Sequence, residues 1–121
     1  MLKGGENMED CIFCKIIKGE IPCSKVYEDE KVIGFKDINP EAPVHVLIIP
    51  KKHISSINDL NSEDANIVGH IFMAAKEIAT KLGVESNGYR VVTNCGKDGG
   101  QTVGHIHFHL LGGRSLKWPP G

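Results

Sequence analysis

The 121-residue chain lacks a long apolar run, an excess of charge of either sign and a second pair of closely spaced cysteines. No segment approaches the roughly 18 consecutive apolar residues of a transmembrane helix, and the opening segment MLKGGENMED lacks the apolar core of a secretory signal. Fourteen basic and fifteen acidic side chains give a net charge of -1, whereas a general nucleic-acid binder is usually basic. We therefore expect a cytoplasmic protein that binds neither nucleic acid nor membrane.

Six histidines and four cysteines are many for a chain of this length. Cys11 and Cys14 form a C-x-x-C pair, while Cys23 and Cys95 stand alone and are interpreted as packing residues. A zinc ribbon needs a second close pair, and a thioredoxin-like site needs a strand where this chain has only a polar tail. Two interpretations of the pair remain. It supplies half of a tetrahedral metal site completed by distant histidines, or it is two ordinary small residues at the start of a helix.

The hydrophobic pattern predicts a single α+β domain over residues 10–121, preceded by a disordered polar tail over 1–9. Apolar residues at helical spacing predict a short helix over 11–18 and a long helix that starts at Asn61 or Ser62 and ends at Leu82. Apolar and β-branched runs predict strands over 25–28, 31–36, 44–49, 89–93 and 102–111. Short connections between consecutive strands favour antiparallel pairing.

Three of the six histidines, at positions 105, 107 and 109, alternate with apolar residues in the last predicted strand. Because side chains alternate across a strand, the imidazoles should share one face, held rigidly at or near an open surface. The apolar face should pack on the long helix. A chance pattern or a simple metal patch is the alternative.

Imidazoles near their ordinary pKa serve as nucleophile, base or acid at neutral pH, and a neutral imidazole nitrogen attacks phosphorus well. Just before the histidines lies the turn Gly99–Gly100–Gln101–Thr102, whose glycines let backbone N–H groups approach an anion. Gln101, Thr102 and Asn94 would add side-chain donors. The combination predicts chemistry at a phosphate group.

The residues HIHFHLL at 105–111 match the pattern His-φ-His-φ-His-φ-φ, with φ apolar, and on this motif the chain resembles the histidine-triad (HIT) family. The resemblance extends to the segments CIFCKIIKGEIP (11–22), APVHVLIIPKKHIS (42–55), GYRVVTN (88–94) and DGGQTVGHIHFHLLGGR (98–114). The closing WPPG is similar to the histidine-triad nucleotide-binding subfamily, the purine nucleoside phosphoramidases. Together these segments span the chain after residue 9.

The resemblance implies a HIT-like fold, with a five-stranded antiparallel sheet, one short and one long helix, and sheets joined across a homodimer. It implies a hydrolase that releases purine nucleoside 5'-monophosphates of the AMP type from amines or other leaving groups, through a nucleotidyl-histidine intermediate. Two alternatives remain: a dinucleoside polyphosphate hydrolase of the same family, and a nucleotide-sensing or partner-binding module with weak catalysis. A nucleotidyltransferase is disfavoured because that branch has Gln where this chain has His109.

The resemblance also implies the site residues. His107 matches the nucleophile, His109 the residue that contacts the α-phosphate, His45 the histidine that orients the nucleophile, and His105 the first member of the triad. The implied substrate-binding residues are Phe35, Asp37, Ile38, Asn94, Gly100, Gln101, Thr102 and Trp118, although position 102 is commonly Ser in the subfamily.

Some bacterial members of the family bind a structural zinc ion that takes no part in the chemistry. Their ligands match Cys11, Cys14, His53 and His105, a Cys2His2 set suited to a closed site. Members of the animal branch generally lack the cysteine pair, so this chain combines a zinc-type start with a phosphoramidase-type tail. His70 matches no functional position and is interpreted as structural or exposed.

Overall fold

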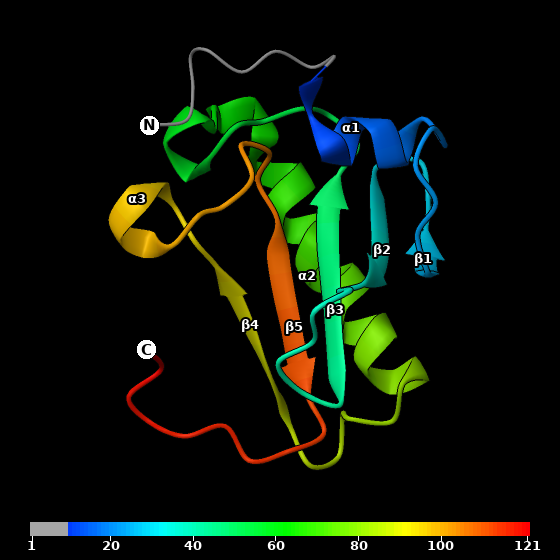
Figure 1. The fold of residues 1–121 in the computed structure, drawn as a ribbon, viewed down its shortest axis with the longest axis vertical. Helices are drawn as coiled ribbons and strands as arrows, with labels where there is room; N and C mark the ends of the chain where they lie inside the picture. Colours follow the sequence, from blue (N-terminus) through cyan, green and yellow to red (C-terminus); the bar gives the residue numbers. More distant parts are fainter. Residues whose placement is uncertain (1–9) are drawn as a thin grey trace.

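Five antiparallel strands form one sheet in the order β1-β2-β3-β5-β4 (Figure 1). The computed structural model describes residues 10–121, so the predicted tail over 1–9 lies outside the described residues. The strands are β1 (Lys25–Glu28), β2 (Val32–Lys36), β3 (Val44–Pro50), β4 (Tyr89–Thr93) and β5 (Phe108–Gly112). The helices are α1 (Ile12–Ile17), α2 (Ala65–Lys81) and the single turn α3 (Gly96–Gly99), with 3-10 turns η2 (Ile57–Asp59) and η3 (Ser62–Asp64). The predicted α+β class and antiparallel sheet are confirmed.

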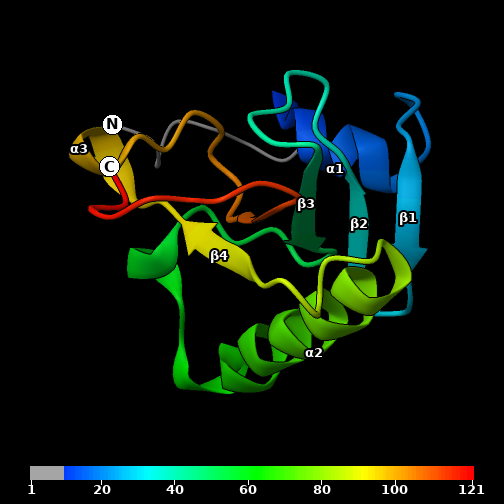
Figure 2. The same cartoon turned by 90° about the horizontal axis from the view of Figure 1, so that it is seen from below.

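The sheet carries α2 on one face and α1 on the other (Figure 2). Successive side chains of β3 pack on opposite faces of the sheet, against α2 and against α1, because they alternate across the strand. Val46 and Ile48 pack in the core that includes the buried stripe of α2, whereas Leu47 and Ile49 pack in a second core with α1. The stripe of α2 consists of Ile71, Ala74, Ala75, Ile78 and Ala79. One strand therefore fixes the position of both helices.

The last strand is shorter than predicted: it begins at Phe108, not at residue 102. Its ladder with β3 ends where Phe108 pairs with Ile48, two residues before the prolyl end of β3. Pro50 has no N–H to offer, and its carbonyl accepts a hydrogen bond from the side chain of His105 at 2.8 Å. The backbone N–H of Ile106 donates instead to the carbonyl of Ile54 at 2.6 Å. Residues 102–107 are thus held by loop and side-chain partners instead of a strand ladder.

The long helix begins as its sequence predicts. Asn61 and Asp64 form a reciprocal capping box over η3, which leads directly into α2. The short helix begins after Cys11, and Gly19, with a φ of 81°, allows the left-handed turn that follows its end. In residues 10–121, no helix combines the length and the apolar composition needed to cross a membrane.

Candidate active site and metal centre

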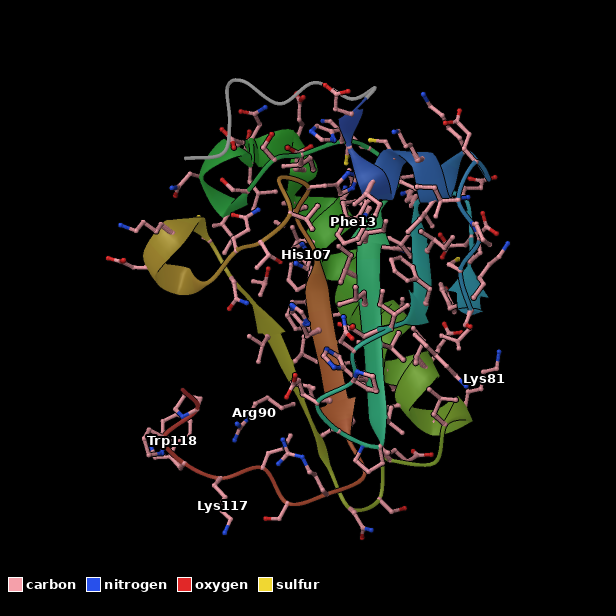
Figure 3. The ribbon with its side chains drawn as sticks, in the orientation of Figure 1. Phe13, Lys81, Arg90, His107, Lys117 and Trp118 are labelled. Atoms are coloured by element: carbon pink, nitrogen blue, oxygen red, sulfur yellow. The ribbon has the colours of Figure 1, made fainter. Side chains whose placement is uncertain are left out.

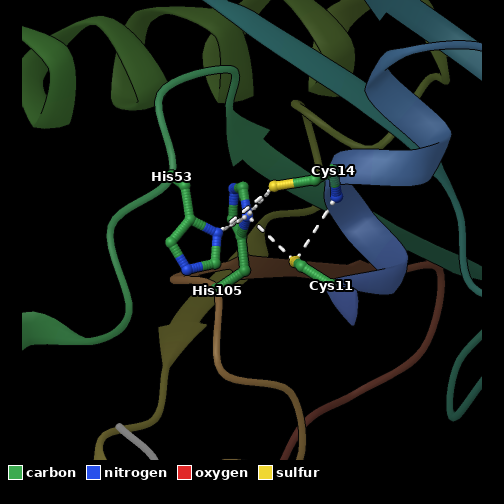
Figure 4. A group of neighbouring side chains, drawn as sticks. All are labelled: Cys11, Cys14, His53 and His105. Carbon is green, nitrogen blue, oxygen red and sulfur yellow. Dashed lines mark hydrogen bonds between the residues drawn. The ribbon is translucent and has the colours of Figure 1, made fainter. Parts of the chain in front are cut away.

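Two cysteines and two histidines converge at the end of the sheet beneath α1 (Figure 4). Cys11 and Cys14 come from the start of α1, His53 from the loop after β3, and His105 from the segment before β5. The Sγ of Cys14 lies 3.2 Å from Nδ1 of His53 and 3.6 Å from Nδ1 of His105. The Sγ of Cys11 lies 3.4 Å from Nδ1 of His105, and the two Nδ1 atoms are 3.1 Å apart. The structure therefore brings together all four predicted metal ligands.

The geometry of this cluster fits a tetrahedral zinc ion. Bonds of about 2.3 Å to sulfur and 2.0 Å to nitrogen place the donor atoms of such a site about 3.3–3.8 Å apart. The donor atoms of this cluster lie 3.1–3.6 Å apart, close to that range. The Nε2–H of His105 donates to the carbonyl of Pro50, which leaves a lone pair on Nδ1. Burial lowers the pKa of His105 to about 4, so its imidazole is neutral and able to bind a metal at pH 7.

His107 lies next to this cluster and is held in one tautomer. Its Nδ1–H donates to the backbone carbonyl of His105 at 2.8 Å, so its Nε2 carries the free lone pair. Burial lowers the pKa of His107, which keeps the imidazole neutral at pH 7. A neutral imidazole with a free Nε2 is the form that can attack phosphorus.

A second hydrogen-bond chain fixes the tautomers of His45 and His109. The backbone N–H of Glu41 donates to Nδ1 of His45 at 3.0 Å, so the hydrogen of the neutral ring must sit on Nε2. That Nε2–H lies 3.0 Å from Nδ1 of His109 and donates to it. The ring of His109 therefore carries its hydrogen on Nε2, where it can donate to a phosphate oxygen. The hydrogen bond of His45 thus goes to His109, not to the predicted nucleophile.

Asp37, His45 and His109 also bring three potential metal donors within 4.8 Å of one another. A cation would need the lone pair of His45 on Nε2, which would move the hydrogen to Nδ1. There it would face the N–H of Glu41, 3.0 Å away. Two N–H groups facing each other would replace a hydrogen bond with repulsion, so this trio fits a hydrogen-bond chain better than a metal site.

The predicted polar contacts lie in the loop that follows β4. Asn94 is half-buried, Thr102 is exposed, and Gly100 has the left-handed φ of 84° that ends α3. Gln101 is buried, and its amide is fully engaged. Its Oε1 accepts from the N–H of Gly96, and its Nε2 donates to the carbonyls of Ser55 and Val103. Gln101 therefore braces this loop against the segment that carries His53.

The predicted apolar contacts are spread more widely. Phe35 is buried and stacks edge-on with Phe13 at 5.8 Å, whereas Ile38 is 91% exposed. Trp118 is 80% exposed and lies at the end of the tail, away from His107 (Figure 3). His109 is half-buried, whereas His105 and His107 are buried, with the ring of Phe13 from α1 packed edge-on against both.

Two contacts near the site have no counterpart in the sequence interpretation. Phe13 packs its ring against the ring of His107. Lys52, the neighbour of His53 in sequence, pairs at 2.6 Å with the buried carboxylate of Asp64. His70, in α2, pairs at 2.6 Å with Asp29, which agrees with the structural role predicted for it. The capping-box spacing from Asn61 to Asp64 could have pointed to the carboxylate of Asp64, but its pairing with Lys52 is visible only in the structure.

Comparison with known proteins identifies the family. The family model described as "Scavenger mRNA decapping enzyme C-term binding" matches residues 10–117. A 14 kDa zinc-binding protein of Zea mays is 53% identical over 112 residues, which cover 91% of this chain and 87% of the relative. A HIT family hydrolase from Legionella pneumophila matches the structure with a TM-score of 0.91 at 53% identity, over 93% of this chain and 100% of its own. A histidine triad nucleotide-binding protein from Candida albicans matches with a TM-score of 0.78 at 38% identity, over 91% and 83% of the two chains. The chain belongs to the histidine-triad family and is a hydrolase of that family.

Proposed function

We propose that the protein hydrolyses purine nucleoside 5'-monophosphates linked to an amine or another leaving group, with His107 as the nucleophile. The observation that carries the proposal is the bond from Nδ1–H of His107 to the carbonyl of His105, which leaves Nε2 unprotonated. Nucleotide binding by a structural relative, the Candida albicans protein, supports the substrate class.

In the proposed first step, Nε2 of His107 attacks the α-phosphorus and the bond from phosphorus to the leaving nitrogen breaks. The amine departs after taking a proton from water. In the second step water attacks the same phosphorus, the bond from phosphorus to Nε2 breaks, and the proton of the water passes to solvent. The Nε2–H of His109 stabilises charge on the phosphate oxygens in both steps.

The other contacts of the nucleotide are part of the proposal. Asp37 lies beside His45, with Oδ2 3.4 Å from its Nε2, and its carboxylate suits a ribose diol. Ile38 offers an exposed apolar surface to the base, and Phe35, buried in the second core, is proposed to line the same pocket. The donors Asn94, Gly100 and Thr102 would face the phosphate, while Gln101 holds their loop.

We also propose a structural zinc ion at Cys11, Cys14, His53 and His105, as the donor geometry and the zinc-binding relative from Zea mays support. Bound there, zinc would hold α1 against the segment before β5 and would take no part in the reaction.

A homodimer is proposed as the working form. The strand β4 lies at one end of the strand order, and in residues 10–121 only β5 pairs with it, so its outer backbone edge is free to extend the sheet into a second copy. The exposed Trp118 at the end of the tail suits a contact with that copy. Light scattering on the purified chain would show twice the monomer mass if the proposal is right.

The decisive experiment is hydrolysis of a fluorogenic adenosine phosphoramidate by the wild type and by His107→Ala. We expect amine release by the wild type and a loss of at least a thousandfold in the variant, with AMP binding retained in both. Equal and slow release by both proteins, together with tight AMP binding, would favour the nucleotide-sensing module. Faster turnover of a diadenosine polyphosphate than of the phosphoramidate would favour the dinucleoside polyphosphate hydrolase.

A further inference from the structure

The turn that follows β5 lies against the loop that precedes β3. Residues 37–43 form this loop. The first residue of β3 pairs with the last residue of β5, so the chain leaves β5 beside the loop. At Gly113, which has a φ of 91°, a Cβ would lie only 2.9 Å from Cβ of Pro43. This close approach brings the next residue, Arg114, to the backbone of the loop.

Arg114 holds the backbone of Glu41. Its Nε–H donates to the carbonyl of Glu41 at 3.0 Å, and its Nη1 donates to the carbonyl of the residue that follows it. The N–H of the same Glu41 donates to Nδ1 of His45 at 3.0 Å. Pro40 and Pro43, on either side, have no N–H with which to hold this stretch. The guanidinium therefore fixes the loop at the residue that contacts His45.

The N–H of Glu41 decides in which direction the hydrogen bond between His45 and His109 runs. While it donates to Nδ1 of His45, the hydrogen of His45 sits on Nε2 and points to Nδ1 of His109, 3.0 Å away. If the loop moved away, water would be able to accept a hydrogen from Nδ1 of His45, and the bond between the rings would be free to reverse. His109 would then donate from Nδ1, and its Nε2 would present a lone pair that repels the phosphate oxygens.

We propose that Arg114 is a positioning residue for His109: by holding the backbone of Glu41 it fixes the tautomer of His45, and so keeps a hydrogen on Nε2 of His109. The inference rests on the proposed function, in which that Nε2–H stabilises charge on the phosphate oxygens. It extends the hydrogen-bond chain from the two histidines to an exposed side chain.

The activity test compares the full-length wild type with Arg114→Gln, Arg114→Lys and Lys81→Gln in turnover of the adenosine phosphoramidate. Lys81, at the end of α2 (Figure 3), is the matched control, because its Nζ also donates to a backbone carbonyl, that of Val26, at 2.8 Å. We expect kcat to fall about tenfold in Arg114→Gln. This is less than the roughly hundredfold or greater loss for a donor removed outright. The loss is partial because Oδ2 of Asp37, 3.4 Å from Nε2 of His45, favours the same tautomer. Arg114→Lys keeps a donor and should recover most of kcat, and Lys81→Gln should match the wild type.

The tautomers themselves can be read from the imidazole nitrogens of protein labelled with nitrogen-15. In the wild type at pH 7, Nδ1 of His45 and Nδ1 of His109 should both give the signal of an unprotonated nitrogen. The signals are assigned by their loss in His45→Gln and His109→Gln. In Arg114→Gln both should shift toward the position of a protonated nitrogen, whereas Lys81→Gln should leave them unchanged. A residue that only stabilised the fold would not move these signals.

A double-mutant cycle tests the route through Glu41. Glu41→Pro removes the N–H directly, so it should lower kcat and move the same signals, whereas Glu41→Ala keeps the N–H and should match the wild type. Adding Arg114→Gln to Glu41→Pro should change kcat by less than twofold, because both changes act through one hydrogen bond.

Four results would overturn the inference while His107→Ala remains inactive. They are unchanged kcat or unchanged imidazole signals in Arg114→Gln, an equal loss of kcat in Lys81→Gln, Arg114→Lys as slow as Arg114→Gln, and full additivity of Arg114→Gln with Glu41→Pro. Full activity of His107→Ala would instead overturn the proposed function, and the imidazole signals would still decide whether Arg114 fixes the tautomers.

Discussion

Acid should unfold this protein partly through His109. Burial, together with the neighbouring His107 and His45, lowers the pKa of His109 to about 4, whereas the unfolded chain titrates near 6.5. Between these two pKa values, His109 is protonated in the unfolded state and neutral in the native state. Stability must therefore fall as the pH falls through this window and must level off below pH 4.

The magnitude follows from the two pKa values. For a fully shielded ring, the linkage relation gives a loss of about 2 kcal/mol between pH 7 and pH 5. Because the His109 ring is only half-buried, solvent screening reduces this to about 1 kcal/mol.

The assay is urea unfolding at pH 7 and pH 5 of the wild type and of His109→Gln, with the protein concentration and the zinc loading held constant. The variant keeps the bond from His45 through its amide oxygen but cannot titrate. It should lose about 1 kcal/mol less stability than the wild type over this interval, whatever its stability at pH 7. An equal loss in both proteins would refute the assigned burial and tautomer of His109.

Three further predictions concern the metal, the core and the tail. The wild type should contain one zinc ion per chain by atomic absorption, whereas Cys14→Ser should contain far less and Cys23→Ser should match the wild type. Two ions per chain would contradict the interpretation of Asp37, His45 and His109 as a hydrogen-bond chain. Ile78→Ala, at a fully buried position in the core under α2, should lower the free energy of unfolding by about 2–5 kcal/mol in the same urea assay, and a loss below 1 kcal/mol would contradict its packing. Arg90 holds the tail through the carbonyls of Leu116 and Lys117, so Arg90→Gln should speed tryptic cleavage after Lys117, and unchanged cleavage would show that other contacts hold it.

The fold was largely predictable because its signals are local. The apolar stripe and the Asn61 cap define α2, and the alternation of β3 places its side chains on two faces. The start of β5 was not predictable in the same way. Residues 102–107 read as strand, but the ladder stops because Pro50, distant in sequence, gives no N–H to continue it.

The candidate site was likewise predictable only in part. The four metal donors were implied by the family resemblance, and the structure brings their atoms together. The histidine tautomers could not be predicted from the sequence. The hydrogen of His45 is placed on Nε2 by the backbone N–H of Glu41, which lies in a loop and donates to Nδ1. The burial of His107 depends on the position of α1, which the alternating pattern of residues 105–109 does not predict.

The central pairing of β3 with β5 also governs how the chain folds. Its partners lie about sixty positions apart in sequence, so a large loop must close before β3 and β5 can pair with each other. Contacts of this range are associated with slow folding. During synthesis Cys11, Cys14 and His53 leave the ribosome well before His105, so three of the four potential metal donors exist in a chain that still lacks residues 105–109. The site is therefore among the last parts of the molecule to assemble.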